Sequence, residues 1–288
     1  MLNIFTSMSG HNISYRNLVS DLQQLYDKNE AVAIANILME HITGLTYSER
    51  LVKDTTLTTQ QTEQLNNATE RLLTGVPIQH ITQTTHFLGA DYFVNEHVLI
   101  PRPETEELVQ WIVDEQQGSQ PSILDIGSGS GCIPISLKKL LPKAAITSID
   151  VSADALDVAK RNATQNNAEV TFLLFDFLNK GNWSQLPSFD IIVSNPPYIP
   201  ISEKEKLDRN VRDYEPGTAL FVPDDDALLF YRHIAEFGKT HLNSGGVIYC
   251  ELHQDYATDT KKMFEQQGYS TALKKDMFGN ERMLSAKR

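Results

Sequence analysis

The sequence predicts an α/β protein, in which a small helical bundle precedes a mostly parallel seven-stranded sheet that ends in an antiparallel hairpin. Three observations predict this class. Apolar residues recur at helical spacing through the first 75 or so residues. Beyond residue 100, strand-like runs alternate with helical runs, which is typical of a parallel sheet covered by helices on both faces. The last two strand-like runs are separated only by a short turn around Gly279.

The N-terminal part, residues 1–75, is expected to form a helical domain. Its apolar stripes predict helices at residues 14–26, 30–42 and 59–73. Gly75 with Pro77 beyond it is typical of the end of a helix. Two interpretations remain open for this domain: an appendage that only packs, and a domain that recognises a macromolecular substrate.

A connector at residues 76–100 is expected to contain a β-hairpin, because aromatic and β-branched residues flank Gly89. The α/β domain is expected to follow at residues 101–288, with a helix starting within residues 101–106. Its strands are predicted at residues 122–126, 145–150, 170–174, 190–194, 246–252, 269–275 and 282–286. Helices are predicted after the first two strands, to Leu141 and Asn166, and at residues 227–242.

Composition limits the compartment and the partners. Hydrophobic residues make up 41% of the 288 residues and charged residues 22%, as in soluble globular proteins. Residues 1–10 contain no Lys or Arg and no long apolar stretch, so we expect no signal peptide and a cytoplasmic protein without membrane contact. Cys132 and Cys250 have no paired spacing, which fits a reducing compartment. We expect a monomer.

The charge balance favours a protein substrate. Acidic residues number 37 and basic residues 25, so the net charge is −12. Such a field repels a polyanion on average, although a local basic groove would escape this argument. A protein substrate, particularly a basic one, is therefore favoured over direct binding of DNA or RNA.

A glycine-rich turn follows the first strand of the predicted α/β domain, where residues 123–132 read Ile-Leu-Asp-Ile-Gly-Ser-Gly-Ser-Gly-Cys. Glycines allow a backbone to approach a ligand closely. A dinucleotide-binding site would need glycine where Cys132 stands. A P-loop would need lysine at the end of the glycine stretch, but the first lysine after it is Lys138. The order therefore favours a loop for S-adenosylmethionine, with these cofactor-binding residues: Gly127, Ser128, Gly129, Ser130 and Gly131.

Two further residues are expected to bind the cofactor. Asp150 ends the next strand, where its carboxylate can accept hydrogen bonds from both ribose hydroxyls. Phe177 follows the strand after that, where its ring can lie along the adenine, with Asp176 near the exocyclic amine. The alternative for each is structural: Asp150 as a cap and Phe177 as a core residue.

The most specific pattern is Asn195-Pro196-Pro197-Tyr198, directly after an apolar strand. The prolines remove two N–H donors and keep the chain extended, so the Pro196 carbonyl can accept a hydrogen bond. With the Asn195 side-chain oxygen it could hold a planar NH2 group toward a sulfonium methyl, and both acceptors would favour the transition state. Asn195, Pro196 and Tyr198 are expected to be catalytic, and all four to bind substrate. The alternative is a rigid surface turn.

Six further segments carry a family resemblance, at residues 75–80, 87–89, 99–106, 214–216, 219–220 and 279–282. With the motifs above, they resemble the release-factor glutamine methyltransferases (PrmC or HemK) over residues 75–288. The resemblance implies a Rossmann-like class I S-adenosylmethionine-dependent domain. It implies that residues 127–131 hold the methionine part, Asp150 the ribose and Phe177 the adenine, and that residues 195–198 hold a glutamine, with Asn195 also near the cofactor.

The same resemblance implies methyl transfer to N5 of the glutamine in the Gly-Gly-Gln motif of class I peptide chain release factors, which modulates translation termination and leaves S-adenosylhomocysteine. It also implies that the N-terminal helices help to recognise the release factor, and that residues 101–106 line the active site besides starting a helix. Gln83 and Ala227 stand where the family usually has glycine. No pattern of histidines or cysteines predicts a metal site.

Three other functions remain open. An adenine N6-methyltransferase acting on DNA or RNA would present a similar planar NH2 group to the same four residues. Methylation of a glutamine in another protein would need an identical site. A non-enzymatic module that binds S-adenosylmethionine is disfavoured, because binding alone has no use for Asn195-Pro196-Pro197-Tyr198.

Overall fold

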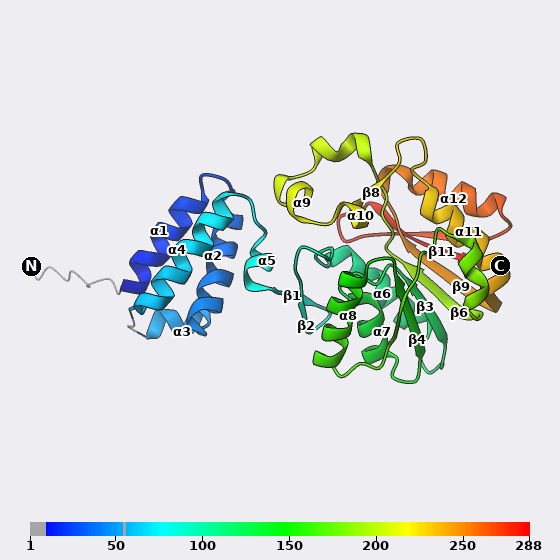
Figure 1. Cartoon of the computed structure of the whole chain (residues 1–288), viewed down its shortest axis with the longest axis horizontal. Coiled ribbons are helices and arrows are strands. Elements are labelled where there is room, and N and C mark those ends of the chain that lie inside the picture. The colour runs from blue at the N-terminus through cyan, green and yellow to red at the C-terminus, as the bar shows by residue number, and fades with distance from the viewer. Residues whose placement is uncertain (1–9, 54–55) are drawn as a thin grey trace, which may run out of the picture. The chain divides into compact units, whose positions relative to one another are not determined.

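Two units make up the computed structural model, which describes residues 10–53 and 56–288 (Figure 1). The first unit contains the described residues up to Gln83 together with Arg209–Tyr214, and the second contains Thr84–Asp208 and Glu215–Arg288. Residues 1–9, part of the stretch where no signal peptide is expected, lie outside the described residues. None of the helices described is long and apolar enough to span a membrane.

The first unit is helical throughout its described residues. Its elements are α1 (Gly10–Leu22), α2 (Lys28–Thr43), α3 (Tyr47–Val52), α4 (Thr59–Leu73), α5 (Ile78–Thr82) and α9 (Arg209–Tyr214). The three predicted helices are confirmed as α1, α2 and α4, whereas α3, α5 and α9 were not predicted. The first helix ends at Leu22 rather than at residue 26, because Asp27 already caps α2 by accepting hydrogen bonds from the N–H groups of Asn29 and Glu30.

Buried leucines hold α1, α2 and α4 together, among them Leu22, Leu38 and Leu72. The predicted end of α4 is confirmed as a Schellman turn. Gly75, at a φ of +95°, donates to the Leu72 carbonyl at 2.8 Å, and Val76 donates to the Arg71 carbonyl at 3.2 Å.

Seven strands form the sheet of the second unit, in the order β10-β11-β9-β6-β3-β4-β5. They are β3 (Ser122–Ile126), β4 (Ala145–Asp150), β5 (Thr171–Leu174), β6 (Phe189–Ser194), β9 (Leu242–Glu251), β10 (Ser270–Lys275) and β11 (Glu281–Lys287). Strand β11 runs antiparallel to both of its neighbours, and the other pairings are parallel. The predicted fold class is confirmed, including the closing hairpin.

Helices cover both faces of this sheet. Successive strand residues point to opposite faces, so alternate apolar residues of one strand pack against helices on opposite sides. On one face, Ile123 and Ile191 pack against apolar residues of α6 (Pro103–Glu115) and α7 (Cys132–Leu140). On the other, Leu124 and Ile192 pack against α11 (Leu229–His241) and α12 (Ala257–Gln266). Helix α8 (Ala153–Gln165) packs beside β4 and β5.

The hairpin predicted after Thr84 is confirmed as β1 (Thr84–Phe87) and β2 (Ala90–Phe93), a separate two-stranded sheet. The side chain of Asn162 on α8 holds it through two hydrogen bonds with the backbone of Phe93, at 2.7 and 2.9 Å.

Several short elements were not predicted, because each is too brief for a periodic pattern. They are η1 (Lys180–Gln185), β7 (Ile199–Pro200), η2 (Ile201–Lys206), α10 (Gly217–Leu220), β8 (Phe221–Val222) and η3 (Gln254–Tyr256). Strands β7 and β8 pair in parallel directly after the Asn-Pro-Pro-Tyr segment.

Candidate active site

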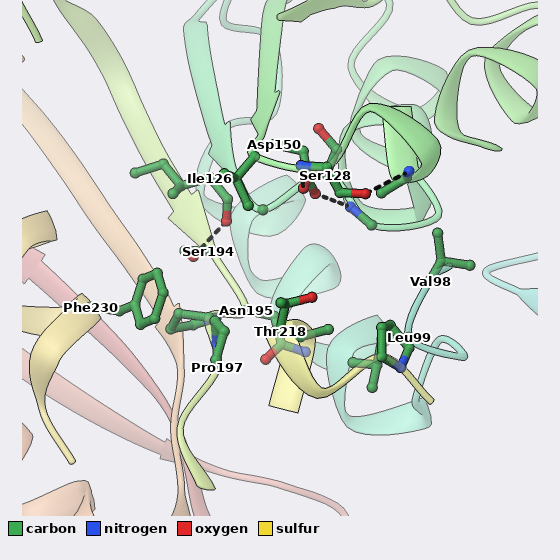
Figure 2. A pocket seen from close by; sticks show the side chains of 18 of the residues that line it. Val98, Leu99, Ile126, Ser128, Asp150, Ser194, Asn195, Pro197, Thr218 and Phe230 are labelled. Atoms are coloured by element: carbon green, nitrogen blue, oxygen red, sulfur yellow. Dashed lines mark hydrogen bonds between the residues drawn. The ribbon is translucent and has the colours of Figure 1, made fainter. Parts of the chain in front are cut away.

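A cavity of about 490 Å³ lies at the carboxyl ends of the parallel strands (Figure 2). This is where open α/β sheets bind ligands, and its size is within the range of about 300–1,000 Å³ usual for small-molecule sites. The walls come from residues 97–105, the glycine turn, Asp150, residues 175–178, residues 194–197, the segment around α10 and the start of α11.

The register of the sheet brings the loops of this site together. Ile126 at the end of β3 pairs with Ser194 at the end of β6, and Ser194 pairs with Cys250 on β9. The Ser194 hydroxyl also donates to the Ile126 carbonyl at 2.7 Å. The glycine turn after β3, Asn195 after β6 and Glu251 at the end of β9 therefore lie next to one another.

The glycines of the turn have two different environments, although all three have positive φ, at +91°, +50° and +80° for Gly127, Gly129 and Gly131. A Cβ added at Gly127 or Gly129 would meet nothing within 4 Å. At Gly131 it would lie 2.9 Å from Ile135 Cδ1 and 3.2 Å from Ala159 Cβ. The first two glycines thus leave open space above the backbone, and the third allows α7 to pack closely on α8.

Four of the five turn residues expected to bind cofactor line the cavity: Gly127, Ser128, Gly129 and Ser130. Gly131 is not among the lining residues. Beneath the turn, the Ser128 hydroxyl donates to Ser148 and the Ser148 hydroxyl donates to Asp125, each at 2.6 Å. Burial raises the pKa of Asp125 to about 8, and the hydrogen bond from Ser148 opposes that rise.

Asp150 and Phe177 both line the cavity. The Asp150 carboxylate accepts hydrogen bonds from the N–H groups of Gly129 and Ser152, each at 2.9 Å, so it also anchors the turn. The Phe177 ring stacks on Trp183 with 5.7 Å between centroids, which makes it part of the core as well as of the cavity wall. Asp176 lines the cavity beside it.

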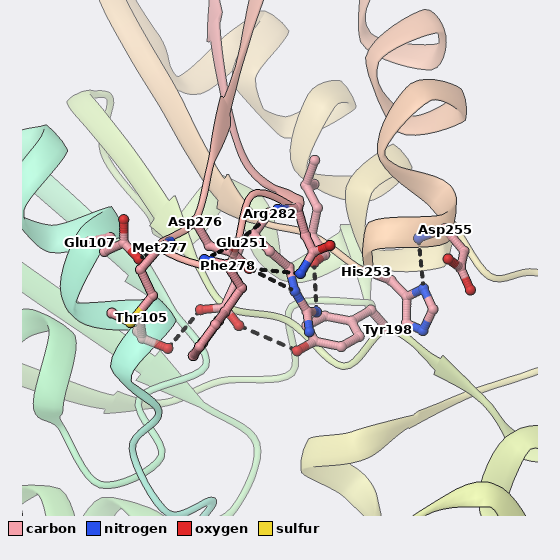
Figure 3. Close-up of polar contacts among 12 residues, drawn as sticks. Thr105, Glu107, Tyr198, Glu251, His253, Asp255, Asp276, Met277, Phe278 and Arg282 are labelled. Carbon is pink, nitrogen blue, oxygen red and sulfur yellow. Dashed lines mark hydrogen bonds and ion pairs between the residues drawn. The ribbon is translucent and has the colours of Figure 1, made fainter.

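Residues 195–198 divide between the cavity and its support. Asn195, Pro196 and Pro197 line the cavity, next to Phe230 and Thr218 in Figure 2. The Tyr198 ring lies outside the lining, edge-on to His253. Its hydroxyl donates to Glu251 Oε1 at 3.3 Å (Figure 3). Burial and then the charge of Glu251 raise the pKa of Tyr198, so the phenol remains a donor.

Thr105 and Glu251 complete the surroundings of Asn195. Glu251 was not predicted, and Thr105 was predicted only as part of residues 101–106. Asn195 Nδ2 donates to Thr105 Oγ1 at 3.2 Å, and Thr105 donates to Glu251 Oε2 at 2.6 Å. Burial raises the pKa of Glu251, whereas the hydrogen bond from Thr105 and the charge of Arg282 lower it. A carboxylate at the end of an otherwise apolar strand is the pattern that could have identified Glu251, because a buried carboxylate needs partners.

A second buried carboxylate holds the opposite wall. The Glu215 side chain is 1% exposed and accepts hydrogen bonds from Arg102 Nη2 at 2.6 Å and from the Ile100 N–H at 3.1 Å. Burial raises the pKa of Glu215, and the charge of Arg102 opposes the rise. Arg102 lines the cavity. The resemblance marked residues 214–216 without giving them a role; in the structure, Glu215 holds residues 100–102 in place beside the cavity.

Comparison with known proteins gives matches over both units. The PrmC N-terminal domain family matches residues 16–82, and the methyltransferase small domain family matches residues 104–211. A relative from Flavobacterium psychrophilum, named release factor glutamine methyltransferase, is 41% identical over 94% of this chain and 97% of its own length. A relative of the same name from Bacteroides thetaiotaomicron is 42% identical over 93% and 96%.

Solved structures resemble the fold. A methyltransferase from Pyrococcus furiosus has a TM-score of 0.52 at 21% identity, covering 77% of this chain and 98% of its own. The hMettl16 catalytic domain, solved in complex with MAT2A 3′UTR hairpin 6, has a TM-score of 0.53 at 18% identity, covering 79% of this chain and 81% of its own. At these identities the likeness shows the fold alone.

Proposed function

The chain belongs to the release factor glutamine methyltransferase family, and we propose that it methylates N5 of the glutamine in the Gly-Gly-Gln motif of class I peptide chain release factors. One observation carries the proposal: Asn195, Pro196 and Pro197 line the same cavity as the glycine turn and Asp150. A substrate amide held by the first group would therefore face a cofactor held by the second.

The residues present fit S-adenosylmethionine, which supplies an electrophilic methyl group on a sulfonium. Gly127 and Gly129 leave open space for the methionine part, since a Cβ at either would meet nothing within 4 Å. The Asp150 carboxylate lies at the end of β4, where it can accept hydrogen bonds from ribose hydroxyls. Phe177 offers an apolar surface for the adenine. The product would be S-adenosylhomocysteine.

Asn195 and Pro196 supply the acceptors for the substrate. An amide nitrogen is a poor nucleophile because its lone pair is delocalised. It would gain positive charge as its bond to the methyl carbon forms and the bond from that carbon to sulfur breaks, and it would then become neutral by losing one N–H proton. The Asn195 side-chain oxygen and the Pro196 carbonyl can each accept one N–H of the substrate. These hydrogen bonds strengthen as the charge develops, so they stabilise the transition state more than the ground state.

The first unit is proposed to recognise the body of the release factor, in line with the match of residues 16–82 to the PrmC N-terminal domain family. Methylation of adenine in DNA or RNA is the alternative, since its NH2 group would suit the same acceptors. The net charge of −12 disfavours it.

Transfer of radiolabelled methyl from S-adenosylmethionine tests the proposal. The acceptors are unmethylated release factor, the same factor with its motif glutamine changed to alanine, and single- or double-stranded DNA. We expect label on the unchanged release factor alone. Label on the alanine variant would refute glutamine as the acceptor, and label on DNA would support the adenine alternative.

Asn195→Ala tests the mechanism. It removes one acceptor from the transition state, so we expect kcat to fall by about 10²–10³-fold, the usual cost of losing one such hydrogen-bond partner. Binding of S-adenosylmethionine, measured by calorimetry, should stay within a few fold, because the glycine turn and Asp150 are unchanged. A wild-type kcat in this variant would refute the role of Asn195.

A further inference from the structure

A single buried carboxylate reaches both ends of the Asn-Pro-Pro-Tyr segment. Glu251 Oε2 accepts from Thr105 and Glu251 Oε1 accepts from Tyr198 (Figure 3). The Thr105 hydroxyl in turn accepts from Asn195 Nδ2. We propose that Glu251 and Thr105 are positioning residues, which set the orientation of the Asn195 amide that meets the substrate. The inference rests on the proposed function, and it adds two residues that act through Asn195.

The chemistry of the groups determines the direction of each hydrogen bond. Glu251 accepts from both Thr105 and Tyr198, so the single hydrogen of the Thr105 hydroxyl is directed to Glu251. The Thr105 oxygen is then left with lone pairs, and it can only accept from the Asn195 side chain. An NH2 group satisfies this arrangement, whereas the carbonyl oxygen of a flipped amide would face another oxygen. The Asn195 side-chain oxygen is thereby kept for the substrate.

The fold holds this carboxylate in place. Glu251 directly follows Cys250, which pairs with Ser194, so Glu251 and Asn195 leave adjacent strands at the same level. Thr105 lies in the first turn of α6 and is 2% exposed, and Glu251 is also 2% exposed. A buried carboxylate is costly unless it is hydrogen-bonded. The hydroxyls of Thr105 and Tyr198 are therefore held as donors to Glu251.

Two substitutions at Thr105 separate the hydroxyl from the shape of the side chain. Thr105→Val keeps the volume and removes the hydroxyl, whereas Thr105→Ser keeps the hydroxyl. We expect Thr105→Val to lower kcat at least tenfold with little change in the KM for S-adenosylmethionine, and Thr105→Ser to recover most of the rate. Equal rates in both variants, or a loss confined to the KM for the cofactor, would overturn the inference.

A double variant tests whether Thr105 acts through Asn195. If it does, Thr105→Val in the Asn195→Ala background should change kcat by less than about twofold, because the group that it orients is already gone. A full additional tenfold loss would show an independent effect and overturn the inference. Melting temperatures of all variants identify any rate that reflects unfolding.

A readout independent of catalysis comes from the side-chain amide of Asn195 in ¹H–¹⁵N NMR spectra, assigned by its loss in Asn195→Ala. The two N–H resonances should shift in Thr105→Val and return close to their wild-type positions in Thr105→Ser. Unchanged resonances in Thr105→Val would overturn the inference. If the wild-type protein failed to methylate release factors, the proposed function would fail, while these resonances would still test the orientation of Asn195.

Discussion

Replacing Gly131 with alanine should destabilise the second unit more than the same change at Gly129. Both residues have positive φ, where alanine costs about 1–2 kcal/mol. Only at Gly131 does the new Cβ collide, at 2.9 Å from Ile135 Cδ1 and 3.3 Å from the Ala159 Cα. That Cα belongs to the backbone of α8 and cannot rotate away, so overpacking should add about 1–3 kcal/mol. The totals are about 2–5 kcal/mol for Gly131→Ala and about 1–2 kcal/mol for Gly129→Ala.

Tryptophan fluorescence is the appropriate assay, because both tryptophans, Trp111 and Trp183, lie in the second unit. At roughly 2–4 °C per kcal/mol for a unit of this size, the melting temperature of Gly131→Ala should lie about 2–12 °C below that of Gly129→Ala. Gly129→Ala should instead weaken binding of S-adenosylmethionine more than its small effect on stability suggests. Equal melting temperatures would refute the argument that Gly131 serves helix packing.

Three further predictions concern other parts of the chain. Gln83→Gly should stabilise the first unit by about 0.5–1 kcal/mol, because glycine adopts a φ of +54° without strain but loses more chain entropy on folding, which offsets part of the gain. Thermal loss of the far-UV helical signal measures this, and a lower melting temperature would contradict it. The hydrogen bond from the Ser122 N–H lowers the pKa of Asp190, so the ionised carboxylate stabilises the fold at a pH above its ordinary pKa, and this stabilisation is lost as the pH falls through the lowered pKa. The difference in melting temperature between wild type and Asp190→Asn should therefore be large at pH 7 and shrink toward pH 3. A constant difference would refute this. Tyr198→Phe removes the hydrogen bond to Glu251 and should lower kcat about fivefold, equivalent to about 1 kcal/mol, with cofactor binding unchanged; a loss as large as that of Asn195→Ala would give Tyr198 a direct role instead.

Features encoded within a few residues could be predicted from the sequence. The end of α4 at Gly75 depends on a glycine that adopts positive φ, and the glycine turn depends on an apolar strand that runs into it. Asn195, Pro196 and Pro197 could be predicted to line the cavity, because residue type alone defines which hydrogen-bonding groups they offer. The closing hairpin followed from the short turn between its strands.

Features set by pairing between distant segments could not be predicted. Thr105 and Glu251 are 146 positions apart and meet only because α6 packs against β9. The turn between β10 and β11 predicts a hairpin, but not that β11 inserts between β10 and β9. Tyr198 was expected to bind substrate, but that its ring lies edge-on to His253 depends on a segment far along the chain and could not be predicted.

Helix α9 makes the first unit discontinuous in sequence. The chain leaves the second unit after Asp208, contributes Arg209–Tyr214 to the first, and returns at Glu215. Within the first unit the Tyr214 hydroxyl donates to the Thr74 carbonyl at 3.0 Å, so α9 is an integral part of it. A truncation that removes the residues up to Gln83 would leave α9 without the residues it packs against. Exchange of the N-terminal unit between relatives, in evolution or in the laboratory, therefore requires two matched replacements rather than a single crossover.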